Sequence, residues 1–395
     1  MHKQNIVIVG GGFGGVKAAL ELADDERFVI TLVTSNDYFQ YYPSLFHTAT
    51  GGRAAQSRIA LSDVFKGSKL KIIVSQAQTI DRRAHTITLA SGESLQYDSL
   101  LLALGVVTNY FGIQGLEEFA YGTKSVEEAL KLKAHLHQQL IDKHEPDLNY
   151  IIVGGGPTGI ELAGAMSAYL KQIIKNHGIR QRTVHIDLIE AAPRLLPRSP
   201  KSISNAVARH LHKLGIRLYL GQIVQGETAD ALTVSGRALT SHTVVWTAGM
   251  TTNPFFKNNS FSFGQHGKVA VNVYLEADDN IYILGDDANT PYSGMAQTAL
   301  HDAKFVTRNL KRITSHKKPK PYAPKQPVTV IPAGPHWAAV QWGPCNFYGR
   351  LGWWLRELAD LVAFHDYEPW KQAGKQFMTE FGQQENCPDC AKMIE

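Results

Sequence analysis

A glycine motif near the start of the chain constrains the fold more than any other feature. Residues 6–9 (IVIV) form a short β-branched run that predicts a buried strand, and residues 16–22 form an Ala- and Leu-rich run that predicts a helix. Gly10, Gly12 and Gly15 lie between them in GxGxxG register. In dinucleotide-binding folds the first glycine permits the tight turn, the second lets the backbone approach a pyrophosphate, and the third lets helix and strand pack closely. A GxGxxG between a strand and a helix therefore predicts a nucleotide site.

The same pattern occurs a second time. Residues 150–153 predict a strand, Gly154, Gly156 and Gly159 repeat the glycine register, and residues 160–174 predict a long helix. Two unrelated glycine-rich turns would rarely both lie between a strand and a helix, so we expect two separate bound nucleotides. The sequence therefore predicts an α/β fold with two Rossmann-like dinucleotide-binding domains.

The residue that ends the strand after each motif indicates which nucleotide binds. The strand predicted for residues 184–189 ends at Glu190, and a carboxylate there accepts two ribose hydroxyls and repels a 2′-phosphate. This favours NAD(H) over NADP(H), although Arg194 lies near enough in sequence to accommodate a 2′-phosphate. After the first motif the same position holds Thr34, followed by Ser35. A hydroxyl binds a ribose without charge assistance, and a plain turn is the alternative interpretation.

Length and charge narrow the class of protein. A chain of 395 residues predicts two or three domains. Much of the formal charge of +5 lies in residues 311–325 (KRITSHKKPKPYAPK), which we expect to be a solvated linker, with attraction to anionic lipid or nucleic acid as the alternative. There is no signal-peptide pattern and no run of about 20 apolar residues, so we expect any membrane attachment to be peripheral.

The cysteines exclude two kinds of redox chemistry. Cys345, Cys387 and Cys390 are the only ones, so no disulfide framework is expected and a reducing compartment fits. Disulfide reductases and sulfide:quinone oxidoreductases use a cysteine pair beside the flavin, and no cysteine precedes Cys345. The CxxC at Cys387 has no second pair, so an idle or interaction tail is preferred over half a zinc site or a metal shared in a dimer, and no metal site is predicted.

Several other segments have a predicted place in the first domain. Residues 38–52 are aromatic and broken by Pro43, which favours packing on a flat ring system. A strand over residues 97–104 ends at Gly105, where a ligand can approach the backbone. Strands over residues 269–273 and 281–284 return to the first domain. The second of these leads to Asp286, a position suited to a ribityl chain or phosphate, and the helix over residues 295–310 begins with Ala296 and Gln297, whose amides face a flavin carbonyl in this interpretation.

Residues 350–364 (RLGWWLRELADLVAF) predict an amphipathic helix. Its apolar face contains Leu351, Trp354, Leu355, Leu358, Leu361 and Val362, and its polar face contains Arg356, Glu357 and Asp360, with Trp353 and Phe364 near the boundary. Tryptophans beside arginine suit a helix lying in a membrane interface. A core or dimer helix is the more common role of such a stripe, and only a family resemblance favours the membrane.

The order of these motifs resembles the type II NADH dehydrogenases, single-subunit flavoenzymes that pass electrons from NADH to quinone. The matching stretches are residues 6–15, 38–51, 100–105, 108–115, 153–165 (VGGGPTGIELAGA), 189–197, 244–249 (VVWTAG), 282–288 and 295–299. They cover most of the first three hundred residues. Sulfide:quinone oxidoreductases are relatives within the larger superfamily.

The resemblance implies a role for each candidate residue. FAD is expected at Gly10, Gly12, Phe13, Gly14, Gly15, Thr34, Ser35, Pro43, Ala77, Gly105, Asp286, Ala296 and Gln297. NADH is expected at Gly154, Gly156, Pro157, Thr158, Gly159, Glu190, Arg194 and Gly249. Glu161 is the first candidate for relaying protons to quinone and His301 the second, while Trp353, Trp354 and Arg356 are expected at the quinone or the membrane. The alternative for Glu161 is that it stabilises the start of its helix.

Two departures from the family pattern affect these expectations. The family has an acid where Thr34 stands, which alters how the FAD ribose is held. The second Gln of the family's Ala-Gln motif is replaced by His301, which puts the electron acceptor in question. A histidine at this position also titrates near neutral pH and is able to feed protons to a quinone.

The sequence thus predicts a non-proton-pumping, FAD-dependent NADH:quinone oxidoreductase of the respiratory chain, peripheral at the cytoplasmic face of the cell membrane. The predicted FAD-binding domain spans residues 1–115 and 250–325, the NAD(H)-binding domain residues 116–249, and a C-terminal membrane-associating or dimerisation region residues 326–395. Partners are membrane quinone, lipid and a second copy of the chain, without nucleic acid. A flavoprotein redox sensor and an NADH reductase with a protein acceptor are the alternatives.

Overall fold

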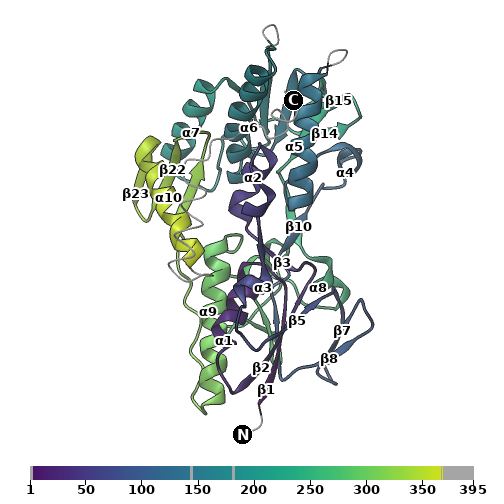
Figure 1. The fold of residues 1–395 in the computed structure, drawn as a ribbon, viewed down its shortest axis with the longest axis vertical. Coiled ribbons are helices and arrows are strands. Elements are labelled where there is room, and N and C mark those ends of the chain that lie inside the picture. Colours follow the sequence, from purple (N-terminus) through teal and green to yellow (C-terminus); the bar gives the residue numbers. More distant parts are fainter. Residues whose placement is uncertain (1–2, 143–145, 180–182, 366, 368–395) are drawn as a thin grey trace. The chain divides into compact units, whose positions relative to one another are not determined.

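Two sheets, one behind each glycine motif, organise the described residues, which are 3–142, 146–179, 183–365 and 367 of a computed structural model. The chain divides into two compact units. The first comprises Met1–Gln40, Arg58–Val107 and Met250–Pro327, and the second comprises Tyr41–Ser57, Thr108–Gly249 and Val328–Glu395. Figure 1 shows the elements of each unit.

The first unit is built on a six-stranded sheet in the order β19-β20-β9-β1-β2-β5. Its strands are β1 (Gln4–Val9), β2 (Phe28–Thr34), β5 (Lys71–Val74), β9 (Ser99–Leu102), β19 (Glu276–Asp278) and β20 (Ile281–Ile283). All neighbours are parallel except β19 and β20. Strand β1 is central, which explains why residues 6–9 are apolar at every position: both faces of a central parallel strand are covered.

Helices and hairpins cover the two faces of this sheet. Ile8 faces helix α1 (Phe13–Leu22), since a Cβ on Gly15 of that helix would lie 3.5 Å from its side chain. Helix α1 in turn packs along α9 (Ala296–Thr314) (Figure 1). Because side chains alternate along a strand, Val7 and Val9 face the opposite way, into a core that includes Phe256 and Ile87. Three small antiparallel or paired sheets complete the strands of this unit. They are β3 (Tyr38–Gln40) with β4 (Arg58–Ala60), then β6 (Ala77–Asp81) with β7 (Thr86–Leu89) and β8 (Ser94–Gln96), and β10 (Val106–Thr108) with β18 (Met250–Thr252). The remaining helices are α3 (Leu61–Val64) and α8 (Pro254–Asn258).

The second unit contains a four-stranded parallel sheet in the order β13-β12-β11-β17. Its strands are β11 (Asn149–Val153), β12 (His185–Glu190), β13 (Ile216–Leu220) and β17 (Thr243–Trp246). Its helices are α2 (Leu45–Ala49), α4 (Leu116–Phe119), α5 (Val126–Ile141), α6 (Pro157–Asn176) and α7 (Lys201–Lys213), and an antiparallel sheet is formed by β14 (Val224–Glu227), β15 (Ala231–Val234) and β16 (Arg237–Thr240). Strand–turn–helix units in parallel order confirm the fold class expected from the two motifs.

The C-terminal elements belong to the same compact unit. They are β21 (Thr329–Pro332), β22 (Ala338–Trp342), β23 (Cys345–Tyr348) and α10 (Gly349–His365), which lies across β22 (Figure 1). Two glycines permit this packing. A Cβ on Gly164 of α6 would lie 2.2 Å from the nitrogen of Gly334, and one on Gly352 of α10 would lie 2.2 Å from the carbonyl oxygen of Ala338.

Two expectations from the sequence differ from the structure. The strand expected over residues 269–273 is wrong: Val269 makes only isolated bridges, and Asn272 folds the segment into a turn by accepting hydrogen bonds from the amides of Tyr274 and Glu276. The compact units also group the chain differently from the predicted cofactor domains, because residues 41–57 and 328–395 both join the second unit. The cofactor domains themselves stay predictions.

Candidate functional site

The first glycine turn is shaped to receive a phosphate group. Gly10 has φ of +119°, and a Cβ there would lie 2.1 Å from the carbonyl oxygen of Ala103. A Cβ on Gly15 would lie 1.9 Å from the oxygen of Gly10, whereas one on Gly12 would meet nothing within 4 Å. The first and third glycines are therefore required by packing, and the middle one leaves open space at the start of α1. Gly12, the N-cap residue of α1, makes no side-chain capping bond, and a helix start of this kind is where a pyrophosphate binds.

The second turn repeats this geometry. Gly154 also has φ of +119°, and a Cβ on Gly159 would again lie 1.9 Å from the oxygen of the first glycine. Gly156 faces open space, and Pro157 and Thr158 are exposed in the first turn of α6. Two turns with the same backbone conformation and the same open middle glycine fit two dinucleotides.

Glu190 and Thr34 occupy equivalent places below the two turns. The Glu190 carboxylate accepts hydrogen bonds from the amides of Gly155 (2.6 Å) and Ala192 (2.7 Å), which hold it at the end of β12. The Thr34 hydroxyl lies below Gly11 and donates to the carbonyl of Asn36 (3.1 Å). An anchored, partly exposed carboxylate suits ribose binding. The buried Thr34 hydroxyl is already used by its own turn, and Ser35 beside it is exposed.

Arg194 organises the loop that follows Glu190. Its guanidinium donates to the carbonyl oxygens of Leu196 (3.0 Å), Ser199 (2.9 Å) and Pro197. Three of its five N–H donors bind backbone carbonyl oxygens, which holds the side chain to this loop. Contact of Arg194 with a nucleotide stays a prediction. Gly249 lies where a Cβ would meet the carbonyl oxygen of Asn109 at 2.4 Å.

The other residues expected at FAD lie at several places in the chain. Phe13 packs edge-on against Phe39 with ring centroids 5.1 Å apart, and a Cβ on Gly14 would lie 3.4 Å from Leu284, so both fill the unit's interior. Gly105, at φ of +68°, faces open space, and Ala77 begins β6. Pro43 lies in the short turn Tyr42–Ser44, which belongs to the second unit.

Three aspartates near the carboxyl end of β20, two in the turn that follows it and one on α9, have different environments. Asp286, the predicted ribityl or phosphate contact, has its carbonyl oxygen held by the ammonium of Lys268. Asp287 is fully buried, and burial raises its pKa to about 7. Asp302 accepts a hydrogen bond from the amide of Gly285 (3.0 Å) and one from the hydroxyl of Tyr322 (2.6 Å), and burial raises its pKa to about 6. These bonds fix the turn at Gly285 beside the start of α9.

The N-terminus of α9 fits the role expected of Ala296 and Gln297. No side chain caps the helix, and Gln297 is exposed in its first turn. One turn later, the Nε2 atom of His301 lies 2.9 Å from the carbonyl oxygen of Ala323, and its ring packs beside Tyr322. His301 belongs to the first unit and Glu161 to the second, so their joint action in proton relay stays a prediction.

Glu161 lies in a cluster of ionisable groups in the second unit. Burial raises its pKa to about 8; the charge of Arg356 lowers the pKa and that of Asp360 raises it. Arg356 forms ion pairs with Glu357 (3.0 Å) and Asp360 (3.0 Å). The hydroxyl of Tyr41 donates to Asp360 (3.4 Å), which connects the aromatic segment to α10.

His47 completes this cluster. Burial, with a smaller contribution from the charge of Arg356, lowers its pKa to about 3, so it is neutral at physiological pH. Tyr41, His47 and Asp360 were not among the predicted site residues. The spacing of Arg356 and Asp360 by four residues is a sequence signal for their ion pair, but the pairing of α10 with residues 41–57 had no such signal.

Helix α10 is oriented with its charged face toward the protein. Arg356, Glu357 and Asp360 are largely buried, whereas Leu351, Trp354, Leu358 and Val362 each expose 52–56% of their surface. Trp353 is partly buried and packs against His336. The apolar stripe expected from the sequence therefore exists, and in the described residues it faces outward.

Neither a membrane-spanning helix nor a metal-binding cluster is found in the part of the chain that the structure describes. Within it, no helix is both long and apolar enough to cross a bilayer. Within the same residues, no group of three His, Cys, Asp or Glu side chains is placed to hold a metal ion. Cys387 and Cys390 lie outside the described residues.

A protein-family comparison decides the wider assignment. The model of the pyridine nucleotide-disulphide oxidoreductases matches residues 4–303, which include both glycine turns and the start of α9. The chain belongs to this family.

Individual relatives narrow the resemblance within the family. A type II NADH:quinone oxidoreductase, Ndh, of Mycobacterium tuberculosis is 28% identical, over 92% of this chain and 85% of its own. A type II NADH:quinone oxidoreductase of Staphylococcus aureus is 25% identical, over 85% of this chain and 88% of its own. The solved structure of NDH2 from Plasmodium falciparum in complex with NADH superposes with a TM-score of 0.87 at 17% identity, over 98% of this chain and all of that one. The predicted resemblance to type II NADH dehydrogenases is confirmed by these relatives.

Proposed function

We propose that this chain is an FAD-dependent type II NADH:quinone oxidoreductase, with FAD at the first glycine turn and NADH at the second. The observation that carries the proposal is the pair of preformed turns, of which only the second is followed by an anchored carboxylate, Glu190. The relatives named NADH:quinone oxidoreductase support quinone as the acceptor. When bound, FAD supplies the hydride acceptor and the two-electron donor, which is chemistry that side chains lack.

The protein's contribution at the second turn is to bind and select NADH. The exposed start of α6 faces the pyrophosphate, and Glu190 accepts the ribose hydroxyls. A 2′-phosphate on NADPH would bring negative charge beside this carboxylate. Arg194 keeps its positive charge, but three hydrogen bonds to backbone carbonyl oxygens hold its guanidinium to the loop that follows Glu190.

In this proposal the second unit supplies a proton for quinone reduction. Forming a quinol requires two protons, and Glu161, with its pKa raised to about 8, holds one at neutral pH. Arg356 stabilises the carboxylate left when that proton departs, because its charge favours the ionised form of Glu161. His301 remains the second candidate for proton delivery. The identity of the second donor is open to test by substitution.

The proposed place of the enzyme is the membrane surface. Quinones dissolve in the bilayer, and the exposed stripe of Leu351, Trp354, Leu358 and Val362 is the kind of surface that enters the interface between headgroups and acyl chains. A peripheral location at the cytoplasmic face follows from this proposal. A homodimer that buries the same stripe is the alternative use of the surface.

Two assays on the purified, FAD-loaded protein test the function. The first follows bleaching of the flavin by NADH without oxygen, and the second follows steady NADH oxidation with a short-chain quinone. Rapid bleaching and turnover with quinone are expected. Bleaching without turnover on any quinone would instead indicate a redox sensor, and turnover with artificial dyes but not quinones would indicate a protein acceptor.

A further inference from the structure

One region of the chain carries an excess of positive charge that the proposed reaction does not use. Residues 303–327 contain eight lysines and arginines and no aspartate or glutamate: Lys304, Arg308, Lys311, Arg312, Lys317, Lys318, Lys320 and Lys325. The rest of the chain contains 32 cationic and 35 acidic residues. The net positive charge of this protein is therefore concentrated at the end of α9 and in the segment that follows it.

That segment is held in place along α9. The basic strap, residues 316–325, turns back so that the side-chain amide of Asn309 donates to the carbonyl of Lys320 (2.8 Å) and accepts from its amide (2.9 Å). Farther along, the hydroxyl of Tyr322 donates to Asp302 (2.6 Å), and Ala323 meets His301. The expectation of a solvated linker holds for the side chains only, because residues 311–314 belong to α9 and the backbone of Lys320 is bonded to the buried side chain of Asn309.

The fixed backbone leaves the lysine side chains outward. Lys317, Lys318, Lys320 and Lys325 are exposed, as is Arg308 on the adjoining turn of α9. These five residues, which we call the basic face, make no ion pair with the residues that the structure describes. Like charges gathered in one exposed segment repel each other, and anions that neutralise them lower this repulsion.

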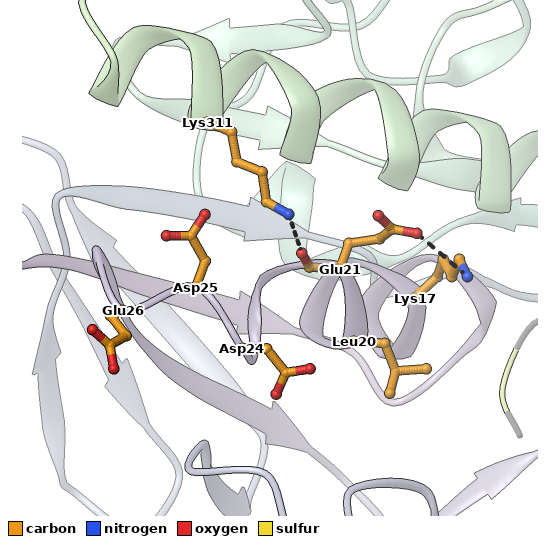
Figure 2. A pocket seen from close by; sticks show the side chains of 7 residues that line it. All are labelled: Lys17, Leu20, Glu21, Asp24, Asp25, Glu26 and Lys311. Carbon is orange, nitrogen blue, oxygen red and sulfur yellow. Dashed lines mark hydrogen bonds and ion pairs between the residues drawn. The ribbon is translucent and has the colours of Figure 1, made fainter. Parts of the chain in front are cut away.

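Lys311, which is close to the basic face in sequence, differs from it by having acidic neighbours. Lys311 reaches helix α1, where its ammonium donates to the carbonyl oxygen of Glu21 (2.6 Å) (Figure 2). It shares an open pocket there with Asp24, Asp25 and Glu26. The acidic residues of this unit thus compensate Lys311 and leave the basic face uncompensated.

We propose that the basic face binds the anionic headgroups of a phospholipid membrane, as a contact of the first unit additional to the apolar stripe of α10. The inference rests on the proposed function in one respect: a quinone acceptor brings the protein to a membrane. Each lysine near an anionic bilayer adds to the attraction within a Debye length. Single-stranded nucleic acid is disfavoured, because its binding uses exposed aromatic rings, and Tyr322 of the strap is partly buried and bonded to Asp302.

Vesicle binding of the full-length, FAD-loaded protein tests the proposal. The test variant combines Lys317→Gln, Lys318→Gln and Lys320→Gln, which leaves the backbone bonds of Asn309 intact. The control variant combines Lys66→Gln, Lys69→Gln and Lys257→Gln, three exposed lysines of the same unit, and so has the same net charge. Sedimentation uses phosphatidylcholine vesicles with and without 30% phosphatidylglycerol, at low and at high salt.

The expected result is specific to the test variant. Its partition onto vesicles with phosphatidylglycerol at low salt falls about a hundredfold, since each lysine contributes roughly fivefold. The control falls much less, and neither variant changes in binding to phosphatidylcholine alone. Turnover with a water-soluble quinone in detergent stays at the wild-type rate for both. A failed activity assay thus counts against the proposed function and leaves the lipid contact separately measurable.

Three outcomes would overturn the inference. One is equal loss in the test and control variants, which would indicate only an effect of net charge. Another is wild-type binding that does not respond to phosphatidylglycerol. The third is unchanged vesicle binding in the test variant with loss of binding to a DNA or RNA oligonucleotide.

Discussion

At the residue scale, single atoms distinguish two turns that look alike in sequence. Both turns have the same backbone conformation, but a carboxylate ends one strand and a hydroxyl the other. Glu190, the proposed ribose contact, is anchored by two amides, while the Thr34 hydroxyl donates to a carbonyl oxygen of its own turn. The selectivity of this protein for its two nucleotides is therefore expected to depend on side chains at the strand ends, more than on the glycines.

Replacing Glu190 with alanine should weaken NADH binding about tenfold, because two charge-assisted hydrogen bonds to the ribose are lost. The KM for NADH in quinone turnover measures this, with the FAD content determined from the visible spectrum. The preference for NADH over NADPH should also fall. Thr34→Val is the matched control and should leave the KM for NADH unchanged; an unaltered KM in Glu190→Ala would remove this residue from the ribose site.

Arg356 and Asp360 should shift the pH dependence of quinone reduction in opposite directions. Arg356 lowers the pKa of Glu161, so Arg356→Gln moves the alkaline limb of the profile to higher pH; Asp360 raises that pKa, so Asp360→Asn moves the limb to lower pH. Shifts of about one pH unit are expected for loss of one neighbouring charge. If the alkaline limb moved in the same direction in Arg356→Gln and in Asp360→Asn, the proposed role of Glu161 would be contradicted.

Replacing Glu161 with glutamine should slow quinone reduction more than it slows flavin reduction by NADH.

Glu227 should make the protein less stable at high pH. It is buried, one of its carboxylate oxygens has no hydrogen-bond partner, and burial raises its pKa to about 8. A carboxyl whose pKa is raised on folding contributes its stability below the unfolded pKa near 4.5 and loses it as the pH rises through about 8. Glu227→Gln should therefore have a higher Tm than the wild type at pH 9 and a similar Tm at pH 5. A Tm difference that does not depend on pH would contradict this.

At the scale of the element, α10 is amphipathic in an unusual sense. Its charged face is buried against its own unit, and its apolar face is exposed. Sequence periodicity predicts the two faces but not which one turns inward, because burying apolar residues is the default for a helix on a globular unit. The inward orientation is accompanied by the hydrogen bond from Tyr41 to Asp360, which joins segments far apart in the chain.

Polar substitutions on the outward stripe should release the protein from membranes without unfolding it. Leu351→Ser with Leu358→Ser removes two side chains that are more than half exposed, so little packing is lost. Sedimentation with neutral phosphatidylcholine vesicles should fall at least tenfold, since about 1 kcal/mol or more of burial is lost at each site. Unchanged activity with a water-soluble quinone in detergent checks the fold. Continued sedimentation with a change from dimer to monomer would indicate that the stripe is a dimer interface.

At the scale of the whole molecule, the two compact units each have a core of their own. A ligand that binds only the folded form of one unit stabilises that unit first. Removing FAD should therefore raise hydrogen exchange in β1, α1 and β2 more than in β11, α6 and β12, and adding NADH should protect the second set. Exchange measured by mass spectrometry on apo-protein, FAD-loaded protein and FAD-loaded protein with NADH tests this. Uniform changes across both units would argue against one nucleotide for each unit.

Much of the fold could be predicted because its signals are local. The strands behind each glycine turn, the helices after them and the strand ends at Glu190 and Thr34 are specified by residues close together in sequence. Dependence on local signals also explains the error at residues 269–273. The apolar run there predicted a strand, whereas the side chain of Asn272 accepts hydrogen bonds from the amides of Tyr274 and Glu276 and forms a turn. A single polar side chain can divert a short apolar segment that lacks a strand partner.

The sequence by itself determined the two nucleotide turns and the family they indicate, because strand, turn and helix signals there extend over only a few residues. The tertiary structure decided three other features: the outward orientation of the apolar face of α10, the cluster of Glu161, Arg356, Asp360 and His47, and the fixed course of the basic strap along α9. Each depends on side chains that are distant in sequence. Burial and charge act through space, so no local pattern specifies which of these groups meet.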